Sequence, residues 1–184
     1  MPSPAGHMLS GLVLGALPTS ENSRVRTRRL VIAALAAAVA DMDMLLVFVG
    51  FDYFKIHRTF THSFISVFAI LVLLWGLNRF FAYKNSKIQI PYLLISACLF
   101  MHPALDLLSE DVYGPRGLTI FWPLLSSFYY PAIDIFPSPF TNLGKALPLS
   151  SLFVIGLKEF FLISIPGLAL ITTWRYLFRR RHKI

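Results

Sequence analysis

Four long apolar stretches constrain the fold of this chain more than any other feature of its sequence. Each approaches the roughly 20 predominantly apolar residues that a helix needs to cross a bilayer. They are residues 30–51, 64–83, 91–108 and 160–178. A fifth stretch is too brief to span alone, and we expect a short span or a re-entrant segment at residues 5–20. The sequence therefore predicts an all-α, polytopic membrane protein with four to five transmembrane helices in a single domain, residues 1–184.

The bulk composition agrees with a membrane protein. The chain is 56% hydrophobic and 14% charged, where soluble domains carry about 25% charged residues. Its formal net charge of +8 might indicate a nucleic-acid-binding surface, but the bases cluster beside apolar segments, which is the pattern of membrane proteins. We therefore expect membrane lipid, and no nucleic acid, among its partners. With a single cysteine, Cys98, an intrachain disulfide is impossible.

The distribution of bases predicts the orientation. Twelve of the seventeen Lys and Arg residues fall into three clusters, which all land on one side when the spans alternate. The clusters are Arg24, Arg26, Arg28 and Arg29; Arg79, Lys84 and Lys87; and Arg175, Arg179, Arg180, Arg181 and Lys183. By the positive-inside rule that side is cytoplasmic, and so is the C-terminus. No charged segment precedes the first apolar stretch, so we expect no cleaved signal peptide.

Several ionisable residues lie in or beside the apolar stretches. Such side chains are costly at membrane depth and usually face each other, a water-filled cavity or a metal ion. The alternation of spans brings all of them to the outer half of the membrane. The sequence therefore predicts a buried metal site that faces the outer side, with these candidate ligands: Asp41, Asp43, His57, His62, His102 and Asp106. A lone histidine near a terminus is mostly incidental, so His7 joins the ligands only through a family resemblance.

The spacing within two of these blocks predicts local geometry. His102 and Asp106 are four residues apart and share one helix face, so they can bind one ion or form a hydrogen-bonded pair that joins helices. Pro103 between them indicates that the helix begins or bends there. Asp41 and Asp43 lie about 200° apart on an ideal helix. Either the helix unwinds locally, or the two carboxylates serve different ions, or one is a ligand and the other a base.

The region from Glu110 to Lys158 is rich in proline and aromatic residues. Proline at this density prevents a regular spanning helix, and aromatic rings suit the membrane interface. We interpret the region as an outer interfacial lid above the site. Lys158 and Glu159, at the entrance to the last span, are expected to form an interfacial ion pair outside the site.

The ligand set indicates a hydrolytic chemistry. Histidine and aspartate without a cluster of thiolates suit zinc or another divalent first-row metal, and six or seven ligands are enough for one or two ions. Zinc would activate water as the nucleophile. Arg58, beside His57, would stabilise the developing anion, because guanidinium pairs with phosphate or carboxylate oxygens. Asp41, if it is not a ligand, would take the proton.

Taken together, the blocks resemble the YdjM type of membrane protein, described as LexA-regulated inner-membrane metal-dependent hydrolases of bacteria. The family pattern is an early His before a Gly, then P-D-x-D, H-R-G-x-T-H-S, and H-x-x-x-D followed by Y-G and a Pro. The matching residues, within about 5–125, are His7 with Gly11, Asp41 with Asp43, His57 and Arg58 through His62 and Ser63, His102 with Asp106, Tyr113 with Gly114, and Pro123. Ala40 and Thr59 replace the family's Pro and Gly, which affects the turns that present Asp41 and His57.

The resemblance implies a multi-pass protein of the bacterial inner membrane. Its expected function is metal-dependent hydrolysis of a phosphoester or another ester, in a small molecule or a lipid-linked substrate. Two alternatives remain open: a divalent metal or proton transporter, and a non-catalytic membrane protein whose His–Asp pairs lock helices together. The inner halves of the four predicted spans contain no Asp, Glu or His, which counts against transport because a transport path needs polar groups near the midplane.

Overall fold

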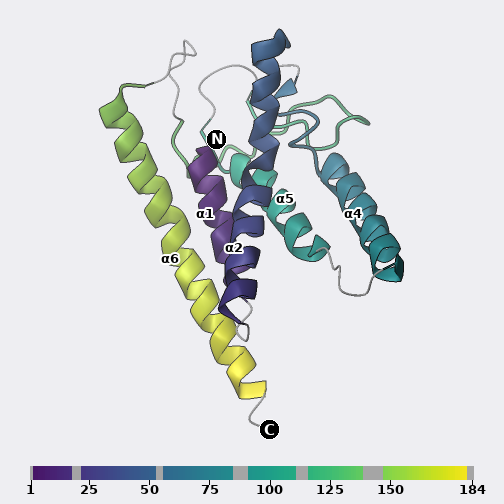
Figure 1. Ribbon diagram of the computed structural model, residues 1–184. Helices are drawn as coiled ribbons and strands as arrows, with labels where there is room; N and C mark the ends of the chain where they lie inside the picture. Colours follow the sequence, from purple (N-terminus) through teal and green to yellow (C-terminus); the bar gives the residue numbers. More distant parts are fainter. Residues whose placement is uncertain are drawn as a thin grey trace.

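The computed structural model describes residues 2–17, 22–52, 56–84, 91–110, 116–138 and 147–181, and these ranges are helical apart from loops and isolated bridges (Figure 1). Their elements are α1 (Pro4–Gly15), α2 (Ser23–Ala38), the 3₁₀ helix η1 (Val39–Val49), α4 (Phe64–Lys84), α5 (Tyr92–Asp106) and α6 (Leu149–Arg181). The predicted all-α class is confirmed.

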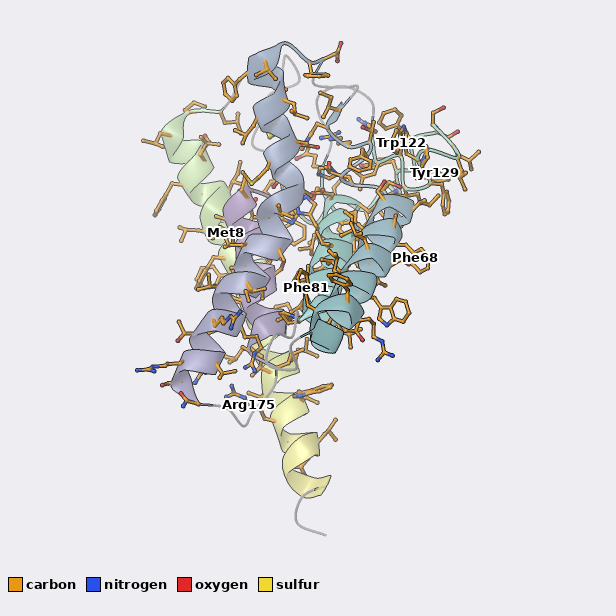
Figure 2. The ribbon with its side chains drawn as sticks, turned by 45° about the vertical axis from the view of Figure 1, so that its right-hand side comes forward. Met8, Phe68, Phe81, Trp122, Tyr129 and Arg175 are labelled. Atoms are coloured by element: carbon orange, nitrogen blue, oxygen red, sulfur yellow. The ribbon has the colours of Figure 1, made fainter. Side chains whose placement is uncertain are left out.

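Within these ranges, three helical stretches are long and apolar enough to cross a membrane: Ser23–Val49, Phe64–Phe81 and Leu149–Leu177. Helix α5, with 15 residues, is apolar but shorter. Apolar side chains such as Phe68 of α4, labelled in Figure 2, are exposed on the outside of the bundle, as expected for contact with lipid. Three to four spanning helices are thus present.

Two helices extend beyond the predicted span boundaries. The helical stretch that contains the first predicted span begins at Ser23, before residue 30, and α6 begins at Leu149, before residue 160. The first turns of α6 therefore occupy part of the region that we had assigned to the outer lid. Helix α1 is 12 residues long, about 18 Å, which is too short for a hydrocarbon core of about 30 Å. It fits the short segment expected at residues 5–20.

The arginine-rich ends of the helices gather at one end of the molecule, which we call the basic end. Helix α2 begins there, and α4 and α6 finish there, with Arg175 labelled in Figure 2. Two arginines bind the last carbonyls of α1: Arg29 Nε donates to the Gly15 carbonyl at 2.6 Å, and a guanidinium nitrogen of Arg175 to that of Ala16 at 3.4 Å. These contacts satisfy carbonyls that a helix C-terminus leaves unpaired. Lys87 and Lys183 lie outside the described residues.

Small residues allow α1 to pack closely between α2 and α6. A Cβ atom at Gly11 would lie 2.2 Å from the Ala33 carbonyl oxygen, and one at Gly15 would lie 3.0 Å from the Ala33 Cβ. On the other side, a Cβ at Gly167 of α6 would lie 2.5 Å from a methyl group of Val13. Contacts of this type drive helix association in membranes, where lipid tails are as apolar as the side chains. They fix the position of α1.

The described part of the outer region, residues 116–138, contains no regular helix, as its prolines predicted. It is hydrogen-bonded to the loop that precedes α4: Ser63 Oγ donates to the Trp122 carbonyl at 2.6 Å. It is also bonded to the end of α5, because the Glu110 amide donates to the Phe136 carbonyl at 2.8 Å. Figure 2 shows its Trp122 and Tyr129 at the opposite end from Arg175. The predicted motif residues Tyr113 and Gly114 lie outside the described residues.

Candidate metal centre

The structure brings all seven predicted metal ligands together in one buried cluster. They come from four segments: α1, η1, the loop before α4, and the last turn and a half of α5. Each side chain belongs to a residue that is at most 9% exposed: His7, Asp41, Asp43, His57, His62, His102 and Asp106.

Five of the seven form an inner group around Asp106. Its Oδ1 lies 3.2 Å from His7 Nε2, and its Oδ2 lies 3.4 Å from Nε2 of both His62 and His102. Asp41 Oδ1 approaches the same two nitrogens, at 3.3 Å from His102 and 3.7 Å from His62. The imidazole rings of His7 and His102 stack with their centroids 3.7 Å apart. Three imidazoles and two carboxylates therefore direct nitrogen and oxygen atoms at one small volume.

Several atoms of this inner group have no hydrogen-bond partner within the described part of the chain. They are both carboxylate oxygens of Asp41, both of Asp106 and both ring nitrogens of His7. An unpaired polar atom at such depth is costly, and native proteins rarely leave one unsatisfied. A divalent cation would provide the missing partner for both carboxylates and for an imidazole. The donor set therefore fits zinc or a similar metal.

The ligand atoms fall into three overlapping groups, within each of which they lie within 4.8 Å of one another. The groups are His7, His102 and Asp106; Asp41, His62 and His102; and Asp43, His57 and His62. Because His102 and His62 each belong to two groups, the arrangement is a chain of adjacent potential sites.

Hydrogen bonds on the far side of two imidazoles determine which nitrogen faces the cluster. His102 Nδ1 lies 2.6 Å from the Ala37 carbonyl, an acceptor, so Nδ1 carries the proton and Nε2 presents a lone pair. His62 Nδ1 lies 2.9 Å from the hydroxyl oxygen of Thr61, whose own proton goes to Asp43. Nε2 of His62 then presents a lone pair toward Nε2 of His102, 3.1 Å away, so an ion beside the two nitrogens could bind both. Burial lowers the pKa of His62 below its ordinary value of 6.5, which keeps the ring neutral.

The two aspartates of η1 are in different states. Asp43 Oδ1 lies 2.8 Å from His57 Nδ1, and its Oδ2 accepts the Thr61 hydroxyl, so both oxygens are engaged. Both oxygens of Asp41 lack such partners. The helix changes from α to 3₁₀ at Val39, which sets this geometry. A 3₁₀ helix turns by about 120° per residue, so two side chains that are two residues apart point about 120° apart around the axis, measured the shorter way. In an α-helix the same angle would be about 160°. The helix is thus irregular here, as one alternative expected, but the two carboxylates lie near different nitrogens of His62: Asp41 near Nε2 and Asp43 near Nδ1.

The loop that carries His57 and His62 contains an unusual backbone conformation at Arg58, whose φ is 67°. Non-glycine residues rarely adopt this left-handed region, and they persist in it where the surroundings hold them. Here the Arg58 carbonyl accepts hydrogen bonds from the Thr119 amide at 3.2 Å and hydroxyl at 3.0 Å. The left-handed residue is thus Arg58 and not Thr59, so replacing the family's Gly at position 59 is compatible with this turn.

In α5, the helix runs through Pro103 to Asp106 instead of beginning at the proline. Pro103 therefore does not separate His102 from Asp106, and both remain on one face as their spacing predicted.

Two residues that support the site are not among the predicted site residues. Thr61 connects Asp43 to His62, and Glu159 of α6 connects to α1. Glu159 is 2% exposed and accepts a hydrogen bond from the Ser3 amide at 2.8 Å, while the Ser3 hydroxyl caps α1 at Gly6. The expected interfacial pair of Lys158 and Glu159 is wrong, because Lys158 is exposed and Glu159 points to α1. The signal that could have identified Glu159 is its position in an apolar segment, where an acidic side chain is costly unless it has a partner.

The family match covers more of the chain than the sequence motifs, which lie within about residues 5–125. The family model described as YdjM inner membrane protein matches residues 1–181, essentially the whole chain. The searches of curated proteins and of solved structures give no match.

Proposed function

The chain belongs to the YdjM inner membrane protein family, and we propose that it is a membrane-embedded, metal-dependent hydrolase that cleaves a phosphoester or another ester. One observation carries this proposal: three imidazoles and two carboxylates from four segments meet in a buried cluster in which several polar atoms are unpaired. A structural lock of His–Asp pairs would close these contacts to ordinary hydrogen bonds. Here the His–Asp distances in the inner group are 3.2–3.7 Å, at or beyond the long end of that range, which leaves room for an ion between the groups.

We assign the inner group, His7, Asp41, His62, His102 and Asp106, as ligands of one or two divalent ions, zinc being the metal that the donor set suits best. Asp43 and His57 form the outermost group and complete a second site. Asp43 also orients His57 directly and His62 through Thr61, the kind of support that ligating histidines commonly receive.

An ion in this cluster would supply Lewis acidity and activate water near neutral pH. The protein's own residues do the rest. Neither oxygen of Asp41 has a hydrogen-bond partner among the described residues, so Asp41 could bind an ion through one oxygen and accept the water proton through the other. Arg58, held beside His57 by the outer segment, would stabilise the negative charge that develops on the ester oxygen.

We propose that the basic end faces the cytoplasm and the metal centre faces the outer side, with the C-terminus cytoplasmic. The gathering of arginines at one end supports this orientation. A centre at this depth favours substrates that reside in the membrane, such as lipids or lipid-linked molecules.

Removal of the metal is expected to abolish activity. Protein purified in detergent should contain at least one equivalent of zinc or another divalent metal by elemental analysis, and should hydrolyse an activated phosphodiester. Chelation should remove both, and the metal should restore both. Protein that lacks stoichiometric metal after purification and after incubation with zinc would refute the proposal and leave the structural alternative. Metal flux in proteoliposomes without ester hydrolysis would instead identify a transporter.

The hydroxyl of Thr61 is expected to support metal binding from outside the ligand set. Thr61→Val keeps the side-chain volume but removes the hydrogen bonds to His62 and Asp43. Loss of such support typically costs about 10–100-fold in metal affinity or activity. Competition with a chelator measures the affinity. Thr172→Val is the control, because the exposed Thr172 hydroxyl bonds only the Ala169 carbonyl of its own helix in the described part of the chain. Equal affinities in both variants would contradict the role of Thr61.

A further inference from the structure

An apolar cleft of about 200 Å³ lies between α1, α5 and α6, next to the metal centre. Apart from Ser10, the residues that line it are apolar, and Phe136 of the outer segment closes it on one side. Its volume is below the roughly 300–1,000 Å³ of sites that enclose a whole small molecule. The cleft is therefore sized for part of a ligand.

The cleft follows the face of α1 that carries His7. Ser10 and Leu14, which line it, are three and seven residues after His7 and so share its helix face. The Ser10 hydroxyl donates to the His7 carbonyl at 2.7 Å, so it is already paired within the helix. From α5, the cleft residue Leu105 directly precedes Asp106. The apolar cleft and the polar cluster are therefore adjacent.

The cleft also opens toward the membrane. Leu162 and Leu170 line it from α6, a spanning helix, and are 40% and 46% exposed. Helix α1 packs against both α5 and α6, whereas α5 and α6 do not pack closely on each other in the described part of the chain. An apolar opening beside a spanning helix, α6, faces hydrocarbon, so the chemistry that fills it is that of a lipid chain.

The direction of the cleft matches that of a lipid in the outer leaflet. From His7, α1 runs toward the basic end, as does α6 (Figure 1). The last lining residues on these two helices are Leu14 and Leu170, so the cleft extends from the level of His7 toward the basic end. A phospholipid with its head group at the outer side extends its chains toward the midplane, along this path. We propose that the cleft binds an acyl chain of a phospholipid substrate and thereby places its phosphoester at the metal centre. This inference rests on the proposed function and specifies its substrate class.

Two tryptophan variants on α6 test the inference. Leu162→Trp fills the cleft, whereas Leu168→Trp places the same ring at a 63% exposed position that does not line it. A phospholipid with a photoreactive diazirine on its acyl chain, added in mixed micelles, should label Met101, Leu105 and Leu162 in the wild type. Labelling of α5 should fall about 10-fold in Leu162→Trp, because about two methylene groups of the lipid chain would lose their burial in the cleft. It should stay unchanged in Leu168→Trp. Leu170→Trp, at the other end of the cleft, replaces Leu162→Trp if that variant does not fold.

An activity comparison separates the inference from the proposed function. In Leu162→Trp, the ratio of kcat/KM for a long-chain phospholipid to kcat/KM for a water-soluble phosphodiester should fall about 10-fold, while Leu168→Trp should keep the wild-type ratio. An equal fall for both substrates, or labelling no stronger in the cleft than around Leu168, would overturn the inference. Failure of the zinc-loaded wild type to hydrolyse either substrate would refute the proposed function instead, and the labelling pattern would still decide whether an acyl chain occupies the cleft.

Discussion

Replacing Asp106 with alanine is expected to remove the bound metal and to lower ester hydrolysis by more than 100-fold. This loss exceeds the roughly 10–100-fold cost of losing a group that only supports a ligand. The reason is that one carboxylate contacts imidazoles from three segments, His7 on α1, His62 before α4 and His102 on α5. Without Asp106, three buried imidazoles would face one another with less negative charge between them, and the affinity for a cation falls accordingly.

The isosteric Asp106→Asn variant separates metal loss from misfolding, because it keeps the volume of the side chain and removes its charge. Elemental analysis and hydrolysis of a soluble phosphodiester are measured on the purified variants, with Asp134→Ala, in the exposed outer segment, as the control. His102→Ala should behave like Asp106→Ala, because His102 belongs to two of the three ligand groups. Full retention of metal by both Asp106→Asn and His102→Ala would remove these residues from the ligand set.

The second large effect is expected at Gly11, where even one methyl group has no room. A Cβ there would lie 2.2 Å from the backbone oxygen of Ala33 and 2.8 Å from the Cβ of Ala37. Helices α1 and α2 would have to separate, which moves His7 away from Asp106. We expect Gly11→Ala to destabilise the protein by about 1–3 kcal/mol or more, the usual cost of overpacking, and to weaken metal binding.

Gly76→Ala provides a matched control on α4, because a Cβ at Gly76 meets nothing within 4 Å. Both substitutions gain up to about 1 kcal/mol of helix propensity, so their difference isolates the contact between α1 and α2. Thermal unfolding in detergent measures stability, and elemental analysis measures metal content. Equal melting temperatures for the two variants would show that α1 does not pack on α2 as described.

Much of this architecture was predictable because two physical costs are visible in a sequence. The length of the apolar stretches indicated the spanning helices, since a bilayer requires a minimum length. The cost of ionisable groups in apolar surroundings identified six residues of the cluster, and the family resemblance added His7; the structure brings all seven together. The separation of Asp41 and Asp43 even pointed to an irregular helix, which is present as η1.

The features that sequence reasoning missed depend on contacts between distant residues. Glu159 acts on Ser3, 156 residues away, so nothing in its local sequence reveals its partner. The close approach of Gly11 to Ala33 is equally invisible before the helices are placed. The start of α6 at Leu149 was missed because Lys158 and Glu159 resembled the polar edge of a span, whereas the buried Glu159 is satisfied by α1 and lets the helix continue.

The length of α6 has a mechanical consequence. Its 33 residues extend about 50 Å, whereas a typical hydrocarbon core is about 30 Å thick, so the helix must lean or project beyond the bilayer. Near the middle of α6, Gly167 lets this helix approach α1 closely, because an added Cβ there would lie 2.5 Å from a methyl group of Val13. A thicker membrane would reduce the lean of α6 and change the width of the cleft beside α5. Bilayer thickness would then regulate how readily a lipid reaches the buried cluster.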